Sequence, residues 1–222
     1  MIPFIDFHTH HIRRAEQIVQ ILNIFPREEV PENSFFSAGI HPWYAADVSD
    51  KEWQLLEEKL NHPACLAIGE AGLDKMKKYL SFYEEQKKVF LRQIHLADKM
   101  QKPLVIHCVR CYDDLFRYLE LLEVPVIIHG YSKSPELAGR LLKIPGLYLS
   151  FGHLLLNSAS HAYKSFLQID LNRALLETDD KPILIEDIYK QAAQIKKLDI
   201  EKIKQQMADN FRQIFKKSVI LP

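Results

Sequence analysis

Short apolar stretches alternate with helical patterns along most of this chain, and this alternation limits its fold more than any other feature of the sequence. Eight stretches have the composition of buried strands: Phe4–Phe7, Ile18–Phe25, Phe35–Ile40, Cys65–Gly69, Pro103–Ile106, Val124–Ile128, Gly146–Phe151 and Ala174–Glu177. Six of them are separated by stretches with helical spacing of apolar residues, the longest over Phe82–Met100. Repeated strand-helix-strand units predict an α/β protein with a parallel sheet.

Eight strands of this kind predict a TIM-type (β/α) barrel, with an open doubly wound sheet as the alternative. A dinucleotide-binding sheet of the second kind has a glycine-rich loop after its first strand, where this chain has His8-Thr9-His10-His11. We expect the barrel to be irregular at its second strand. The link His11–Glu16 has about six residues, whereas a parallel crossover needs a dozen or more. The first helix is therefore predicted to be missing, and the second strand to run antiparallel to the first.

Length and composition favour one soluble globular domain, predicted over residues 1–222. The formal net charge is zero and the chain has no run of Lys and Arg, which argues against avid non-specific binding to nucleic acids. No stretch reaches the roughly 18 apolar residues of a membrane span, and the N-terminus does not have the pattern of a signal peptide. Because three cysteines are too few for a disulfide framework, we expect a cytoplasmic protein. We also expect a monomer without a membrane partner.

Six potential metal ligands stand at the carboxyl ends of apolar stretches. They are His8, His10, Glu70, His107, His129 and Asp179. In barrels the carboxyl ends of the strands form the face on which active sites are built. Four histidines and two carboxylates exceed the roughly three protein ligands of one catalytic zinc, so we predict two divalent cations. Glu70 is the natural bridge between the ions, with His8, His10 and Asp179 on one ion and His107 and His129 on the other.

The segments around these residues resemble, in order, the motifs of the TatD family of metal-dependent deoxyribonucleases and hydrolases. The motifs are IDFHTH, AGIHPW, AIGEAGLDK, PLVIHCVR, VIIHGYS, YLSFG, LLETDD and MADNF, and the resemblance covers nearly the whole chain, from Phe4 to Phe215. The resemblance implies an amidohydrolase-like TIM barrel, a site for two divalent cations (Zn, Mg, Mn or Ni) and hydrolysis of phosphodiester bonds in DNA. It maps the family's metal ligands onto the same six residues. It also places His41 and Arg110 where the family contacts the substrate phosphate.

Two further residues follow strands on the predicted active face. His153 comes after the seventh stretch, and either a contact with the substrate or a structural role fits it. Tyr131 follows the sixth stretch. Together with Trp43 and Tyr44 it is a candidate for stacking on a nucleobase, with packing against neighbouring loops as the alternative.

The leading hypothesis is a divalent-metal-dependent deoxyribonuclease that hydrolyses phosphodiester bonds with a metal-activated water. Glu70 and Asp179 are the predicted catalytic residues, Asp179 orienting the water and accepting its proton. Because the surface is not strongly basic, DNA ends or single strands are the expected substrates. The alternative is hydrolysis of a small ester, lactone, amide or phosphate on the same two-metal site. A third class, a binding protein with a degenerate site, is disfavoured because all six ligands are present.

Overall fold

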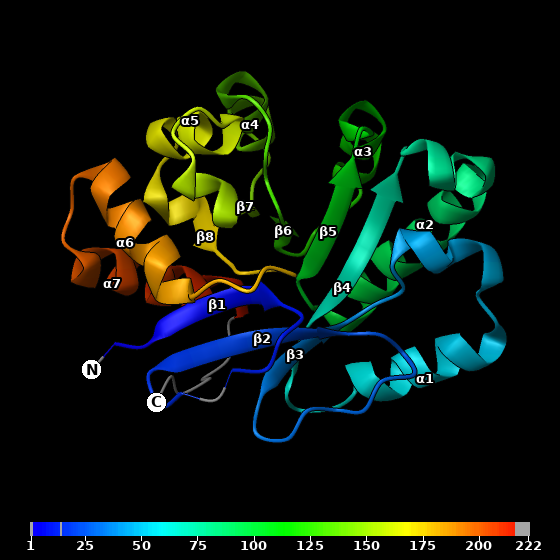
Figure 1. Cartoon of the computed structure of the whole chain (residues 1–222). Coiled ribbons are helices and arrows are strands. Elements are labelled where there is room, and N and C mark those ends of the chain that lie inside the picture. Colours follow the sequence, from blue (N-terminus) through cyan, green and yellow to red (C-terminus); the bar gives the residue numbers. More distant parts are fainter. Residues whose placement is uncertain (1, 14, 216–222) are drawn as a thin grey trace. The chain divides into compact units, whose positions relative to one another are not determined.

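The computed structural model describes residues 2–13 and 15–215, and Figure 1 shows its strands and helices in the colours of the chain. The strands are β1 (Phe4–Thr9), β2 (Ile18–Ile24), β3 (Phe35–Ala38), β4 (Cys65–Asp74), β5 (Leu104–Val109), β6 (Val126–Ile128), β7 (Leu147–Phe151) and β8 (Ala174–Leu176). The α-helices are α1 (Asp50–Leu60), α2 (Tyr83–Met100), α3 (Tyr112–Leu119), α4 (Pro135–Leu141), α5 (His161–Gln168), α6 (Ile185–Lys196) and α7 (Ile200–Phe215). Four short 3₁₀ helices are described: η1 (Pro42–Asp47), η2 (Lys77–Phe82), η3 (His153–Leu156) and η4 (Leu171–Arg173).

The chain divides into two compact units. Residues 1–22 and 129–222 belong to one, called here the outer-sequence unit, and residues 23–128 belong to the other, called the middle unit. The sheet order follows the chain, from β1 to β8. Every strand pair described within either unit is parallel, namely β1–β2, β7–β8, β3–β4, β4–β5 and β5–β6. The single domain expected over residues 1–222 stays a prediction.

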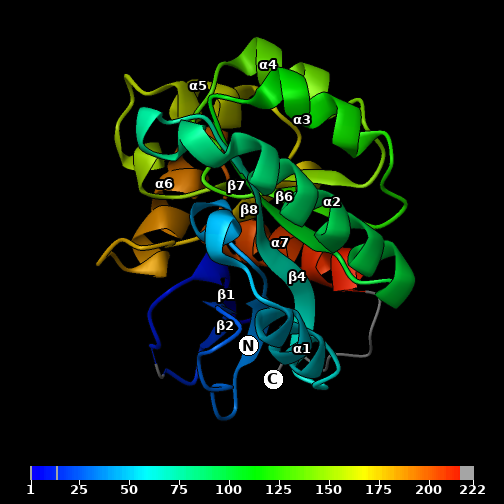
Figure 2. The ribbon, with the colours of Figure 1, turned by 90° about the vertical axis from the view of Figure 1, so that its right-hand side faces the viewer.

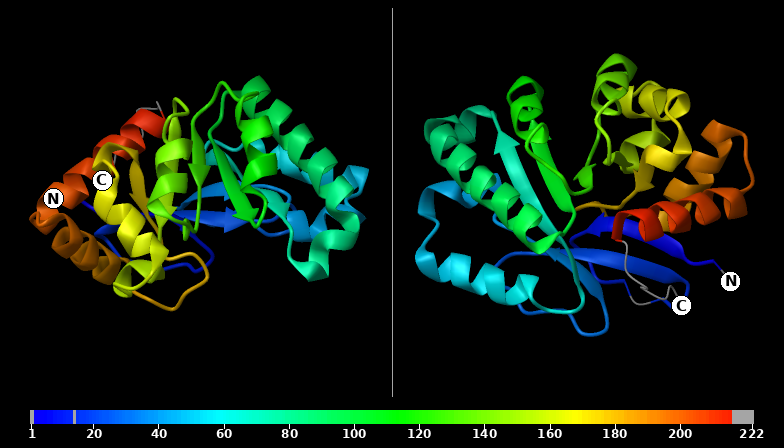
Figure 3. Two further views of the ribbon diagram at one scale, coloured as in Figure 1. Left: turned by 90° about the horizontal axis from the view of Figure 1, so that it is seen from above. Right: turned by 180° about the vertical axis from the view of Figure 1, so that it is seen from behind.

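In the outer-sequence unit the first and last strands adjoin. Thr9 at the end of β1 forms a parallel bridge with Asp179, three residues after β8. The helices α6 and α7 pack on each other and on β1, as the orange and red ribbons beside the blue strand show (Figure 3). From α6, the buried Tyr189 hydroxyl bonds both the N–H and the C=O of Ile5 at 3.0 Å. Adjoining first and last strands are expected of a barrel and not of an open doubly wound sheet.

In the middle unit α2 lies across β4 (Figure 2). Its apolar face, with Val89, Phe90, Ile94 and Ala97, is buried. Two buried amides on the same helix satisfy loop backbone. Gln93 bonds the N–H and C=O of Ile40 at 2.8 and 3.0 Å, and Gln86 bonds the N–H and C=O of Asp74 at 2.8 and 3.2 Å. Both amide side chains are fully buried, so water does not compete for these hydrogen bonds. The bonds therefore fix the segments before His41 and after Glu70.

The predicted direction of the second strand is wrong. Phe4 pairs with Ile18 and Thr9 with Leu22, so β1 and β2 run parallel, as the two blue arrows of Figure 1 show. The link between them, residues 10–17, contains eight residues, and the described ones form no helix, as the sequence predicted. Six residues of β1 cover about 17–20 Å, while eight extended residues reach roughly 26 Å. An extended link can therefore return to the start of β1 without the longer crossover that a helix requires.

The strand that carries Glu70 is longer than predicted. β4 runs from Cys65 to Asp74, so Glu70 lies within it and not at its end. The register against β5 shifts between Ile68 and Ala71, which is the mark of a bulge. The apolar residues after Glu70 continue the strand, and the carboxyl end moves to Asp74.

In residues 2–13 and 15–215, no helix is both long and apolar enough to span a membrane.

Candidate metal centre

Two imidazoles meet one carboxylate in the middle unit. The Glu70 Oε1 atom lies 2.8 Å from His107 Nδ1 and 3.1 Å from His41 Nε2, and the two imidazole rings are 4.5 Å apart between centroids. His41 Nδ1 accepts the backbone N–H of Trp43 at 3.1 Å, which leaves Nε2 as the nitrogen that faces Glu70. We call His41, Glu70 and His107 the Glu70 cluster.

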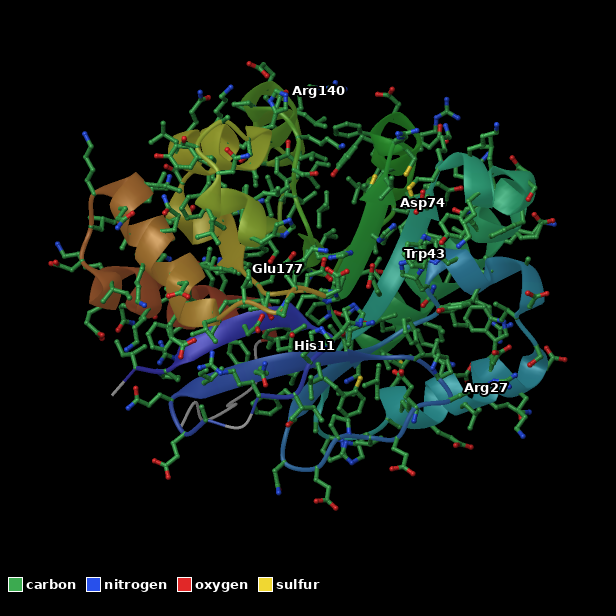
Figure 4. All side chains as sticks on the ribbon, viewed as in Figure 1. His11, Arg27, Trp43, Asp74, Arg140 and Glu177 are labelled. Carbon is green, nitrogen blue, oxygen red and sulfur yellow. The ribbon has the colours of Figure 1, made fainter. Side chains whose placement is uncertain are left out.

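Asp74 supports this cluster from behind. Its Oδ2 atom lies 3.3 Å from His107 Nε2 and accepts the indole N–H of Trp43 at 2.7 Å, while Oδ1 accepts the N–H of Met76 at 2.7 Å. Burial acts to raise the pKa of Asp74, but the bonds from His107, Trp43 and Met76 prevail and hold it below the ordinary value. Figure 4 shows Asp74 and Trp43 together beside β4. His107 thus has a carboxylate at each ring nitrogen, and such contacts fix the orientation of an imidazole ring, as carboxylates do at known metal sites.

Glycine makes the close packing of this cluster possible. A Cβ at Gly72, whose φ is +144°, would overlap the carbonyl of His107, so only glycine lets β4 approach β5 here. A Cβ at Gly39 would lie 2.7 Å from the backbone of Gly69, directly before Glu70. Because neither Gly39 nor Gly69 carries a side chain, the segment that ends in His41 can approach the backbone before Glu70.

A second set of ligands gathers in the outer-sequence unit. The Nε2 atoms of His8 and His10 each lie 3.6 Å from Asp179 Oδ1. His8 lies in β1 and His10 directly follows it, and both face the same carboxylate, as the sequence suggested. Backbone bonds bring Asp179 to them, since its N–H donates to His8 O at 2.9 Å and its C=O accepts the N–H of His10 at 3.1 Å. We call His8, His10 and Asp179 the Asp179 cluster.

Asp179 adopts a left-handed backbone conformation, with φ of +55°. Aspartate tolerates this conformation better than most residues, and such outliers concentrate at functional sites. Behind the cluster, Thr178 donates from its N–H and its hydroxyl to the buried Asp6 at 2.9 and 2.7 Å. Burial raises the pKa of Asp6 to about 6 against the lowering effect of these bonds.

His129 and Glu177 adjoin the Asp179 cluster within the same unit. The His8 and His129 rings are 4.4 Å apart, and His129 Nδ1 lies 3.9 Å from Glu177 Oε1. Glu177, labelled in Figure 4, is fully buried and accepts the N–H of Gly130 at 2.6 Å. Burial raises its pKa, opposed by the charge of His129.

The donor atoms of both units suit a divalent cation. Three sets of described residues, each within a single unit, place one ligand atom per residue within 4.8 Å of the others. They are His41, Glu70 and His107 in the middle unit, and His8, His10 and Asp179 together with His129, Glu177 and Asp179 in the outer-sequence unit. Two imidazoles with one carboxylate, or one imidazole with two carboxylates, match the nitrogen and oxygen ligands of zinc, manganese and related ions. The bridge by Glu70, and one ion shared by His107 and His129, stay predictions.

Comparison with known proteins decides the family. The sequence matches the family described as TatD related DNase over residues 8–216. The chain belongs to this family. The 3'-5' RNA nuclease TATDN2 of Homo sapiens is 35% identical over 161 residues, covering 70% of this chain and 21% of that protein. The 3'-5' ssDNA/RNA exonuclease TatD of Edwardsiella piscicida is 27% identical over 208 residues, covering 84% of this chain and 79% of that protein.

A solved TatD homologue has the same fold. The structure of YJJV, a TatD homologue from Escherichia coli K12, superposes with a TM-score of 0.85 at 21% sequence identity, covering 98% of this chain and 100% of that one. The predicted fold class, a TIM-type (β/α) barrel, is confirmed by this likeness together with the parallel strands. This chain thus has the TatD fold, although it spans only about a fifth of the human relative.

The remaining predicted substrate residues lie at different depths. Arg110 is exposed directly after β5, with φ of +58°, and His153 is half-buried at the start of η3. Tyr131 is buried; its hydroxyl donates to Ser134 O at 2.9 Å and its ring packs on Phe151. For Tyr131 the structure agrees with the packing alternative and not with stacking on a nucleobase.

Asp74 and Glu177 contact the candidate ligands His107 and His129 in this TatD protein, and neither was among the residues predicted from the sequence. Both stand at even spacing from a predicted ligand: Glu177 two residues before Asp179, and Asp74 four residues after Glu70. Asp74 was missed because the predicted strand ended at Gly69, whereas β4 continues to Asp74. Glu177 was the last residue of the predicted stretch Ala174–Glu177, and it directly follows β8.

Proposed function

We propose that this TatD-family protein is a divalent-metal-dependent nuclease that hydrolyses phosphodiester bonds at DNA ends or in single strands. The observation that carries the proposal is the pair of clusters, each with two imidazoles and one carboxylate within 4.8 Å of one another. The names of two relatives support nucleic acid as the substrate, since one is a 3'-5' RNA nuclease and the other a 3'-5' ssDNA/RNA exonuclease. Single-stranded RNA therefore belongs among the substrates to be tested.

We assign one divalent cation to the Asp179 cluster and a second to the Glu70 cluster. When bound, such ions lower the pKa of a coordinated water and offset negative charge on a phosphate. His41 joins the ligand set in this proposal because its Nε2 atom lies 3.1 Å from Glu70. This assignment replaces the contact with phosphate that the resemblance implied for His41.

The chain's own groups supply the proton transfer and the positioning. Asp179 is 27% exposed, so a water can reach its carboxylate, and Asp179 accepts the proton of the attacking water. Asp74 orients His107 through its 3.3 Å contact with Nε2. Arg110, exposed after β5, binds the phosphate through its planar fork of donors.

Hydrolysis of a small ester, lactone, amide or phosphate by the same residues is the second candidate. The uncharacterised metal-dependent hydrolase YcfH of Escherichia coli K12, 26% identical over 206 residues, bears a name that specifies no substrate. We further propose that the protein acts in the cytoplasm as a monomer. Analytical ultracentrifugation tests the oligomeric state.

A cleavage assay separates the candidates. Purified protein is incubated with end-labelled single-stranded DNA, duplex DNA and single-stranded RNA, each with Mg²⁺, Mn²⁺, Zn²⁺, Ni²⁺ or chelator. We expect metal-dependent shortening of single strands and its loss in chelator. Intact nucleic acid in every metal, together with turnover of a lactone or ester panel, would refute the nuclease and establish the second candidate.

A further inference from the structure

Trp43 is a fixed side chain that is nevertheless exposed. Its ring stacks on Tyr79 at 5.0 Å with planes 16° apart, and its indole N–H donates to Asp74 at 2.7 Å. His41 contacts it at 4.5 Å between ring centroids. Despite these contacts, 40% of Trp43 is exposed. A tryptophan held by its edge and one face has a rigid apolar surface ready for a ligand at low entropic cost.

The second tryptophan of the chain provides the contrast. Trp53 on α1 is only 7% exposed, and the Arg92 guanidinium lies 3.9 Å from its ring centroid. Trp53 therefore packs as a structural residue. Holding Asp74 in place requires only the N–H edge of Trp43, so that role does not account for its exposed surface.

The surroundings of Trp43 suit a polyanion with flat rings. Tyr44, the next residue, is 54% exposed, and the Trp43 ring lies 6.0 Å from that of the metal-ligand candidate His107. Exposed cations stand at the ends of the two strands that bear the cluster: Lys77 and Lys78 follow β4, and Arg110 follows β5. These two strand ends adjoin, since Lys75 N–H donates to Val109 O at 2.9 Å.

We propose that Trp43 is a stacking platform for a base of single-stranded nucleic acid, placed beside the Glu70 cluster, with Lys77 and Arg110 binding the flanking phosphates. Aromatic stacking with backbone-tracking cations is the usual way in which proteins hold unpaired strands without sequence preference. A base inside a duplex is already stacked on both faces and is not available to Trp43. The proposal rests on the proposed nuclease function, whose substrate it specifies as an unpaired strand.

The first experiment measures binding without catalysis. In a W53F background Trp43 is the only tryptophan, so its fluorescence reports directly on the proposed contact. With chelator present, we expect an oligo-dT strand to quench this fluorescence, and an abasic strand of equal length and charge to cause little quenching. Equal quenching by both strands would overturn the proposal, because the abasic strand has phosphates but no bases.

Variants separate stacking from support of Asp74. By fluorescence anisotropy of a labelled oligo-dT in chelator, W43A is expected to weaken binding roughly tenfold or more, whereas W43F, which keeps a ring but loses the bond to Asp74, retains most of it. L121A, which removes an even more exposed apolar side chain after α3, leaves binding unchanged. K77A weakens normal and abasic strands by the same factor.

Two results would overturn the stacking proposal: W43A binding as well as the wild type, or W43F losing as much affinity as W43A. The second result assigns Trp43 to the support of Asp74 alone. Failure of the proposed nuclease is a separate result, namely no cleavage in any metal despite base-dependent binding in chelator. If the protein cleaves single strands but W43A binds them with normal affinity, the nuclease proposal stands and only the stacking proposal for Trp43 is refuted.

Discussion

The two ligand clusters are similar in composition but differ in how tightly they are bonded. In the Glu70 cluster the imidazole nitrogens lie 2.8 and 3.1 Å from one carboxylate oxygen, within hydrogen-bond distance. In the Asp179 cluster the two separations are both 3.6 Å, beyond that distance. The Glu70 cluster is a hydrogen-bonded network backed by Asp74, whereas in the Asp179 cluster both histidines pair with one carboxylate oxygen at the longer separation of 3.6 Å.

This difference suggests a division of labour. A network with a second carboxylate behind it favours strong and oriented metal binding. A carboxylate that is partly exposed, as Asp179 is, can accept a proton from a water that reaches it. We therefore expect changes in the Glu70 cluster to affect metal content, and changes at Asp179 to affect turnover.

The largest effect is expected from Glu70→Gln. The amide removes the charge that both histidines face, and one of its two ends presents N–H₂ where an acceptor stood. We expect the variant to lose metal and its cleavage of single-stranded DNA to fall below detection. Metal content after dialysis, measured by mass spectrometry beside the cleavage rate, tests this, with E58Q on the exposed part of α1 as control. Full metal content at an undiminished rate would contradict the assignment of Glu70.

Asp179→Asn is expected to separate metal binding from turnover. The amide oxygen still faces His8 and His10, so the metal is retained, but the proton acceptor is gone. Loss of a general base costs roughly 10²–10⁴-fold in rate. The matched control is D180N, since Asp180 is the next residue, exposed and paired with Lys181 at 2.8 Å. A D179N enzyme with near wild-type kcat would remove Asp179 from the proposed role.

The carboxylates behind the clusters give a third test. Asp74 accepts from Trp43 and Met76 and faces His107, so the amide of D74N cannot serve every partner. We expect a 10- to 100-fold loss in metal affinity or rate, roughly as for other residues that orient a metal ligand. E177Q keeps the oxygen that accepts from Gly130 and should lose less. Metal titration and kcat/KM of both variants decide this, and an equal loss in the two would show that the units are supported alike.

The sequence was sufficient to predict the barrel and to nominate the residues that gather in each unit. The alternation of apolar stretches and helical patterns predicted the fold, and the i, i+2 spacing predicted that His8 and His10 lie together. The minimum length of a crossover that contains a helix did not predict the direction of β2. The link before β2 is extended, so it needs only enough residues to span the length of β1. The extension of β4 to Asp74 depends on the close approach of Gly72 to His107, which no local pattern encodes.

Trp43 and His41 show the same limit at the level of side chains. Their proposed roles depend on tertiary contacts, since the indole of Trp43 contacts Asp74 and the imidazole of His41 contacts Glu70. Both partners stand about 30 residues further along the chain. Sequence motifs marked these positions as functional, and the tertiary contacts are the basis on which His41 is proposed as a metal ligand.

The smallest effect concerns how each unit holds the segment that leads to its histidines. In the outer-sequence unit the Tyr189 hydroxyl bonds Ile5, three residues before His8, and in the middle unit the Gln93 amide bonds Ile40, directly before His41. Each pair satisfies one buried N–H and one buried C=O. Y189F leaves both groups of Ile5 without that partner, which costs roughly 1–3 kcal/mol in the free energy of unfolding.

Chemical denaturation of Y189F, with Y163F as the matched control, measures this cost. Tyr163 is half-buried on α5 in the same unit, and its bond to Ser160 comes from the backbone N–H, so removing its hydroxyl leaves that bond intact. We expect Y189F to be less stable than Y163F, with unchanged metal content in the folded protein, because the ligands of the Asp179 cluster also have their own backbone bonds. Equal stability of the two variants would mean that water replaces the Tyr189 hydroxyl at Ile5, and that β1 is held by its neighbouring strands alone.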